Sequence, residues 1–197
     1  MRLLPALFFL AIAAGACNYF SARPVSRVDG VIAPDEPVQV NRSRLPSFSM
    51  AGFRVTPVAD FSLQARVLST ERYYLGPSAE LAPVDLALGW GPMSDSAVLA
   101  RLRISQSDRF YFYRWSGAPP IAPTDIVTHS ANMHMIPADD EIRKRLEQVR
   151  VGQVVALRGY LVRTQAPDGS HWNSSMVRTD SGSGACELVW VKEITVH

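Results

Sequence analysis

The feature that most constrains this fold is a strict alternation of apolar and polar side chains. Between residues 61 and 67, phenylalanine, leucine, alanine and valine alternate with serine, glutamine and arginine. Because successive side chains of a strand point to opposite faces, this pattern predicts a β-strand with one buried face. The segments 109–115, 154–164 and 186–196 are rich in aromatic or β-branched residues, which also favour strands.

One segment has a strong helical pattern. Between residues 139 and 149, apolar side chains recur at i, i+4 and i+7, acidic residues come first and basic residues follow. This order complements the helix dipole, so the pattern predicts a helix with one buried stripe. Two shorter helices are expected, one over residues 83–88 and one beginning after the capping residue Asp95.

The order of these elements predicts the fold class. Strands come first and the main helix follows. A hairpin comes next, with its turn at Pro167-Asp168-Gly169 and its second arm over 171–178, and then a final strand. We therefore expect a mainly β (α+β) domain with one main helix, folded as a small antiparallel barrel. The order resembles an OB-like Greek-key barrel, in which a helix lies between the third and fourth strands.

The first 17 residues are typical of an export signal. Arg2 supplies a positive charge, and about 14 apolar residues follow it. This run is too short to cross a hydrocarbon core of roughly 30 Å comfortably. It fits the apolar region of a secretory signal, which spans about 7–15 residues.

Cys17 follows this apolar run and has more than one interpretation. The small side chains of Ala14 and Ala16 suit ordinary signal peptidase. Gly15-Ala16-Cys17 also resembles a lipobox, in which the cysteine sulfur is acylated, although Ala14 stands where leucine is usual. A lipoprotein, a soluble exported protein and an uncleaved anchor all remain open. The lipoprotein interpretation best explains a cysteine at this place.

The rest of the chain divides near residue 52. Prolines punctuate residues 18–51 without a persistent period, which predicts an extended linker that makes few contacts with the domain. Residues 52–197 are expected to form one strand-rich globular domain. The chain is 47% hydrophobic and 19% charged, which is a globular composition.

Composition argues against several classes of protein. The net charge is +2, too small to favour a nucleic-acid-binding protein, where a clustered basic face is expected. Cys17 and Cys186 do not form a CxxC pair, so zinc and thioredoxin-like sites lack their ligands. No pattern in the sequence indicates a cofactor.

The histidines are candidates for metal chemistry or catalysis. His129, His134 and His171 could meet a carboxylate of residues 139–140 and hold a metal ion, but their spacing matches no known ligand pattern. We therefore predict structural histidines rather than a metal site. A hydrolase would instead combine His171 with Ser174, Ser175 and Asp180, yet no GxSxG motif exposes a serine.

Aromatic residues are candidates for ligand binding. On the predicted strand 109–115, Tyr111, Tyr113 and Trp115 share one face and could stack on sugars or bases. The alternative is that both faces are buried. Trp90 lies between two glycines and could either anchor a ligand or cover an edge of the barrel. The candidate ligand-binding residues are Trp90, Arg109, Tyr111, Tyr113, Trp115, His129, His134 and His171.

Three stretches of the chain carry a resemblance to a known family. They are DLALGWGPMSD at 85–95, HSANMH at 129–134, and RTD at 178–180 together with GACE at 184–187. These stretches resemble uncharacterised exported envelope proteins of Gram-negative bacteria. The resemblance implies a shared fold and an envelope location, and it brings no activity and no catalytic residue.

These observations together predict a non-enzymatic envelope protein on the periplasmic side of a membrane. It would meet the membrane through its N-terminal signal or lipid, and would bind another envelope protein or an unknown ligand. A barrel that binds carbohydrate or nucleic acid through an aromatic face is the first alternative. A hydrolase or metal enzyme based on the histidines is the second.

Overall fold

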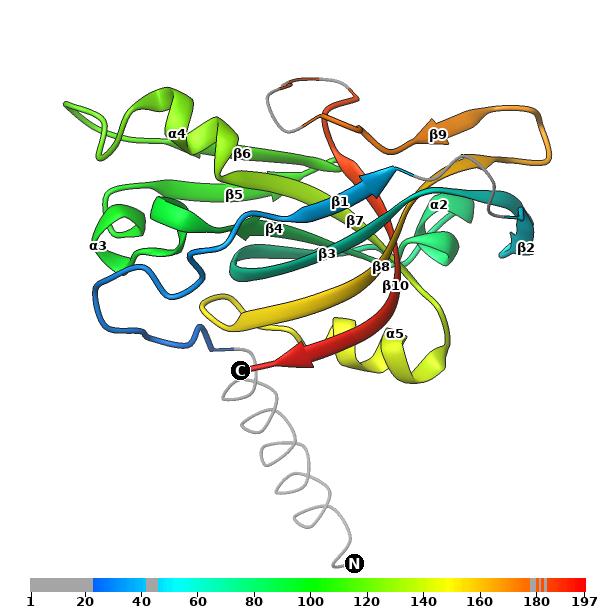
Figure 1. Cartoon of the computed structure of the whole chain (residues 1–197), viewed down its shortest axis with the longest axis horizontal. Coiled ribbons are helices and arrows are strands. Elements are labelled where there is room, and N and C mark those ends of the chain that lie inside the picture. Colours follow the sequence, from blue (N-terminus) through cyan, green and yellow to red (C-terminus); the bar gives the residue numbers. More distant parts are fainter. Residues whose placement is uncertain (1–22, 42–45, 178–179, 181, 183) are drawn as a thin grey trace, which may run out of the picture.

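The computed structural model describes residues 23–41, 46–177, 180, 182 and 184–197, and these form a mainly β protein around one large mixed sheet (Figure 1). The export signal and Cys17 lie outside the described residues. The strands are β1 (Val38–Asn41), β2 (Phe48–Met50), β3 (Phe53–Arg72), β4 (Val84–Gly89), β5 (Arg103–Ser107), β6 (Phe110–Arg114), β7 (Ser130–Pro137), β8 (Val154–Gln165), β9 (His171–Asn173) and β10 (Glu187–Val196). The helices are α2 (Pro77–Leu81), the 3-10 helix η1 (Gly91–Ser94), α3 (Ser96–Leu99), α4 (Pro123–Thr128) and α5 (Asp140–Glu147).

Five strands of the large sheet form a closed ring. They pair in the order β3, β4, β7, β10 and β8, and β3 pairs again with β8. Within this ring only β7 and β10 run parallel. The prediction of a mainly β domain with antiparallel pairing is therefore confirmed, except for that one pair.

β3 makes the ring possible because it is long enough to pair with two strands. Residues 54–66 pair with β8, and residues 66–72 pair with β4. The expected alternation continues along this strand, with Phe61, Leu63, Ala65 and Val67 all buried. Pro57 lies at a shift in register beside Ala59, where a proline without an N–H group is tolerated.

The main core fills the ring and is closed by α5. The side chain of Asp139 caps this helix by accepting a hydrogen bond of 2.8 Å from the Ile142 N–H. The predicted stripe of Ile142, Leu146 and Val149 is buried against the ring strands. The main helix is therefore confirmed, and it lies between β7 and β8, which are the third and fourth ring strands in chain order.

The structure of residues 83–88 differs from the sequence prediction. Residues 83–88 are not a short helix, because Val84–Gly89 form a strand that pairs with β3 on one edge and β7 on the other. All of its residues are buried. A strand covered on both faces does not alternate in polarity, so the usual signal is missing. The short helix after Asp95 does form as α3, capped by the Asp95 carboxylate.

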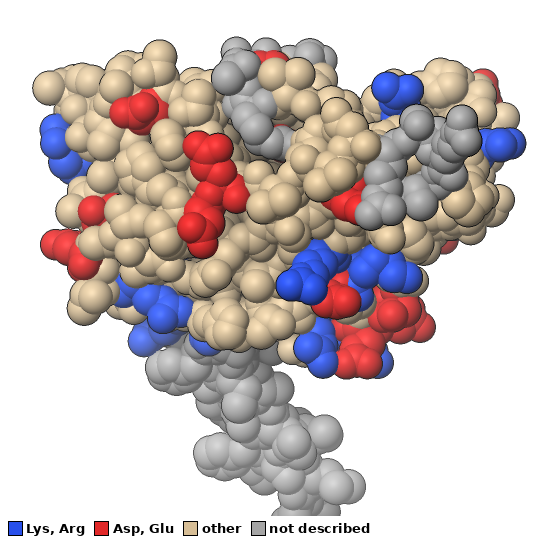
Figure 2. Space-filling view, in the orientation of Figure 1, with Lys and Arg blue, Asp and Glu red and all other residues tan. Residues whose placement is uncertain are grey.

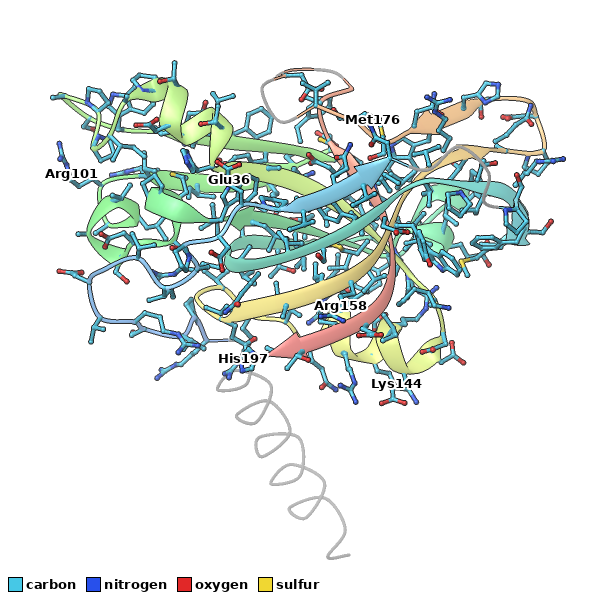
Figure 3. The ribbon with its side chains drawn as sticks, viewed as in Figure 1. Glu36, Arg101, Lys144, Arg158, Met176 and His197 are labelled. Carbon is cyan, nitrogen blue, oxygen red and sulfur yellow. The ribbon has the colours of Figure 1, made fainter. Side chains whose placement is uncertain are left out.

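The segment predicted as a linker also differs from expectation. β1 pairs with β3, Ala33 is fully buried, and the Val25 N–H donates to the Val151 carbonyl at 2.8 Å. The Gln39 side chain donates to the carbonyl of Met176, which Figure 3 labels near the tip of β1. The prediction of few contacts is therefore wrong for the described residues, because backbone pairing at a sheet edge needs no side-chain pattern.

The β5–β6 hairpin forms a separate two-stranded sheet that lies over the ring. Ile104 of β5 and Tyr111 and Tyr113 of β6 pack with Ala87 of β4, so the hairpin covers part of the ring's outer face. Among the described residues, no helix is long and apolar enough to cross a membrane.

The close approach of β8 and β10 gives a testable prediction. A Cβ atom at Gly159 would overlap the Trp190 carbonyl oxygen of the neighbouring strand. We expect Gly159→Ala to lower the free energy of unfolding by about 2 kcal/mol, measured by urea denaturation. Arg158→Ala is the control, because Arg158 is exposed on the same strand and should change stability by less than about 0.5 kcal/mol. Equal stability of the two variants would contradict the close approach.

Candidate functional site

An aromatic cavity of about 230 Å³ lies between β6, the start of β7 and the segment that leads into β10. Its aromatic walls come from Trp90 and β6, and its polar walls from β7 and the following loop. Phe110 and Phe112 are 42% and 50% exposed, and their ring centroids lie 6.4 Å apart, so together they form an exposed apolar pair at the cavity. The lining residues are Trp90, Phe110, Tyr111, Phe112, Tyr113, Val127, Ser130, Ala131, Asn132, Asp180, Gly182, Ala185, Cys186 and Glu187.

Trp90 is the deepest aromatic residue of this cavity. Its side chain is 1% exposed and also packs in the main core of the ring. Its backbone N–H donates to the His129 carbonyl at 3.0 Å, which fixes the loop that carries it. Its indole Nε1 is buried and has no hydrogen-bond partner among the described residues. A buried donor without a partner is uncommon in folded proteins, and the residue that carries this one is part of the cavity lining.

The tyrosines face the ring rather than the solvent. The Tyr111 hydroxyl donates to Ser130 Oγ at 3.4 Å, and burial raises the pKa of Tyr111 to about 12. Tyr113 stacks on Trp115 with ring centroids 6.3 Å apart. The face expected to bind a ligand is therefore half-buried, and the exposed aromatic residues of β6 are the phenylalanines on its other face.

A buried polar network lies beside this cavity, on the same outer face of the ring. Asp85 of β4 is fully buried and stands opposite His134 of β7 in the register. His134 Nδ1 lies 2.8 Å from Asp85 Oδ2, an ion-pair distance without hydrogen-bond alignment. Asn132, two residues earlier on β7, donates to the Arg109 carbonyl at 2.9 Å. The network therefore joins both ring strands to the hairpin.

Arg109 is the cation of this network and belongs to the turn of the hairpin. Its Nη1 donates to Asp85 Oδ1 at 2.7 Å, and its guanidinium lies 3.5 Å from the Tyr73 ring centroid and 5.3 Å from that of Trp172. The Arg109 N–H donates to the Tyr73 hydroxyl at 3.0 Å. Burial, assisted by the nearby Asp85 carboxylate, raises the pKa of Tyr73 to about 12.

The three histidines do not converge. His134 is buried against Trp172, with ring centroids 4.7 Å apart. His129 ends α4, where its Nδ1 contacts the Asp125 carbonyl. His171 is exposed on β9. No cluster of three metal-ligating side chains occurs within the described ranges.

The residues considered for nucleophilic catalysis are also separate. Ser175 donates to Asp180 at 2.6 Å, while Ser174 donates to a backbone carbonyl. Across the described residues, no hydrogen bond links His171 to these side chains. Burial raises the pKa of the Cys186 thiol, which disfavours its reactive thiolate form.

Part of this site was predictable from the sequence, and part was not. Trp90, Tyr111 and Tyr113 line the cavity, and Arg109 and His134 belong to the adjacent network, whereas Trp115, His129 and His171 line neither. Asp85 and Asn132 were not expected there. The available signal was the polar residues inside two largely apolar strands, Asp85 in β4 and Asn132 with His134 in β7, since polar residues in a buried strand need partners.

No family model, no curated protein and no solved structure matches this chain. The resemblance to exported envelope proteins therefore stays a prediction.

The burial of Asp85 gives a testable prediction. Asp85→Asn leaves the Arg109 charge without its carboxylate, so we expect the free energy of unfolding to fall by about 3 kcal/mol. The control is Glu141→Gln, which breaks the 2.7 Å pair with Arg145 on the exposed face of α5 and should cost less than about 0.5 kcal/mol. Urea denaturation measures both variants. Similar losses would show that burial does not distinguish the two pairs.

Proposed function

We propose that this chain is a non-enzymatic binding module of the cell envelope, and that the aromatic cavity is its ligand site. The observation that carries the proposal is a cavity of about 230 Å³ with aromatic walls, one of which is Trp90, whose buried indole N–H has no partner among the described residues. Ligand sites typically combine apolar walls with a few polar groups that fix orientation. The polar side chains in the lining of this cavity include Ser130, Asn132, Asp180 and Glu187.

The size of the cavity limits its ligand. Drug-sized ligands occupy roughly 300–1,000 Å³, so a cavity of about 230 Å³ suits one ring or one side chain. The exposed Phe110 and Phe112 extend apolar surface at the cavity. Partly exposed aromatic residues around a pocket are typical of protein interfaces, where one aromatic anchor fills the pocket. We therefore propose a protein partner that inserts an aromatic side chain.

We also propose that the ring of five strands is an OB-like barrel. The pairing order β3, β4, β7, β10 and β8 supports this assignment, as does α5, which connects β7 to β8, the third and fourth of these strands along the chain. OB-folds bind ligands on the face of the second and third strands and on two adjoining loops. In this chain the hairpin covers that face. Arg109 lies between Tyr73, in the connection from β3 to β4, and Trp172 of β9, in the connection from β8 to β10. The covering hairpin explains why the proposed site is a cavity and not an open cleft.

The cavity proposal predicts a specific response to N-acetyl-tryptophanamide. The chain has four tryptophans, so a nitrogen–proton NMR spectrum contains four indole signals, and Trp90→Phe identifies that of Trp90. We expect N-acetyl-tryptophanamide to shift the Trp90 signal, and Phe112→Ser to weaken this binding at least fivefold. Leu75→Ser is the control, because Leu75 is 90% exposed and lies outside the cavity lining.

Two results would contradict this proposal. One is an unchanged Trp90 signal at millimolar N-acetyl-tryptophanamide. The other is a shift caused by methyl β-glucoside and not by the aromatic probe, which would favour the carbohydrate-binding alternative.

The envelope location rests on the N-terminal residues. We propose that Cys17 carries lipid, because buried acyl chains contribute about 0.8 kcal/mol per CH₂ and several chains hold a protein at a membrane. We expect Cys17→Ser to move the protein from the membrane fraction to the soluble periplasm, while Cys186→Ser leaves it membrane-bound. A mature chain that begins at Cys17 without added lipid mass would contradict acylation. A chain that retains Met1 would instead support an uncleaved anchor.

A further inference from the structure

A second hollow, which we call the basic groove, lies at the end of β8 and is separate from the aromatic cavity. It has a volume of about 620 Å³ and is lined by residues of β3, β8 and β9 and the residue after β9. None of its lining residues is acidic. The lining residues are Arg54, Thr56, Arg163, Thr164, Gln165, His171, Asn173 and Ser174.

The strand register places six of these side chains on one face. Arg54 pairs with Gln165, and Thr56 pairs with Arg163. On the other edge of β8, Gln165 pairs with His171 and Arg163 with Asn173. Directly paired residues point to the same face, so three adjacent strands contribute to one row of donors. Arg54 and Arg163 are diagonal neighbours, a spacing of roughly 7–8 Å between residues.

The basic side chains of the groove have no acidic partner among the described residues. Arg54, Arg163 and His171 are exposed, and none forms an ion pair or side-chain hydrogen bond with another described residue. Arg109 differs, because its guanidinium is bound to the Asp85 carboxylate. Figure 2 shows basic groups at the end of the molecule that carries β9. Two adjacent guanidinium groups without a carboxylate repel each other, and an anion between them would relieve that repulsion.

We propose that the basic groove binds a phosphate group. Each guanidinium can donate two parallel hydrogen bonds to an oxyanion, and the amides of Gln165 and Asn173 add further donors. A carboxylate has two acceptor oxygens, whereas a phosphate offers three or four. Phosphate therefore matches this number of donors better, and arginine is well suited to bind it with two bonds.

The position of the groove favours a phosphate ester in solution over a lipid headgroup. Val25, near the first described residue, contacts Val151 just before β8 begins, whereas the groove lies where β8 ends. The twelve residues of β8 separate these points by roughly 35–40 Å. Figure 3 labels His197 at the end near Val25, and Figure 1 places β9 toward the opposite end. If the chain is tethered as proposed, the groove faces away from its own membrane.

The experiment compares two double variants of the full chain. Arg54→Gln/Arg163→Gln removes the groove arginines, and Arg103→Gln/Arg114→Gln removes another exposed cross-strand pair on the hairpin. Binding of inorganic pyrophosphate is measured by calorimetry at low ionic strength. Sedimentation with phosphatidylglycerol vesicles is measured in parallel, with phosphatidylcholine vesicles as the blank. Thermal unfolding confirms that each variant is folded.

We expect pyrophosphate binding to weaken at least tenfold in the groove variant and less than twofold in the hairpin variant. The same contrast seen only with phosphatidylglycerol vesicles would assign the phosphate to a lipid headgroup and would still support the groove. Equal losses in both variants would mean that net charge alone attracts the anion, and would overturn the proposal. Failure of the wild-type protein to bind either probe would also overturn it.

Discussion

β3 hydrogen-bonds along both edges, to β8 over its first part and to β4 over its last part, and this double pairing closes the ring. Every other feature depends on that closure. A closed ring gives the apolar side chains one enclosed core, which α5 completes. It also gives the outer face of β4 and β7 a fixed curvature on which the hairpin can pack. β3 has one shift in register against each of these neighbours, and a strand bends most easily at such irregularities.

The outer face of the ring carries buried polar groups whose desolvation is unfavourable. A buried ion pair adds little net stability, because desolvation offsets most of its attraction. What the Asp85–Arg109 pair does supply is position: it holds the turn of the hairpin over β4, while Asn132 binds the Arg109 carbonyl from β7. The hairpin in turn forms one wall of the aromatic cavity. The buried charge therefore determines where the candidate ligand site lies.

Sequence patterns identified the elements with one buried face and missed those without one. The strand from Phe61 to Val67 and the helix after Asp139 each have a polar and an apolar side, so their periodicity was visible. β4 is buried on both faces and β1 lies at an edge with exposed side chains, so neither has a period to detect. The convergence of Asp85 and His134 depends on a pairing between segments about fifty residues apart. Periodicity within one segment contains no information about that pairing.

β9 connects the two proposed sites because successive residues of a strand face opposite sides. His171 and Asn173 line the basic groove, while Trp172 between them packs on His134 and lies near Arg109. β9 has three residues, and among the described strands its backbone pairs only with β8. An anion that restrains His171 and Asn173 would also restrain Trp172, and through it the packing around Arg109. Because Arg109 holds the hairpin over the aromatic cavity, occupancy of the groove and order at the cavity would depend on the same short strand.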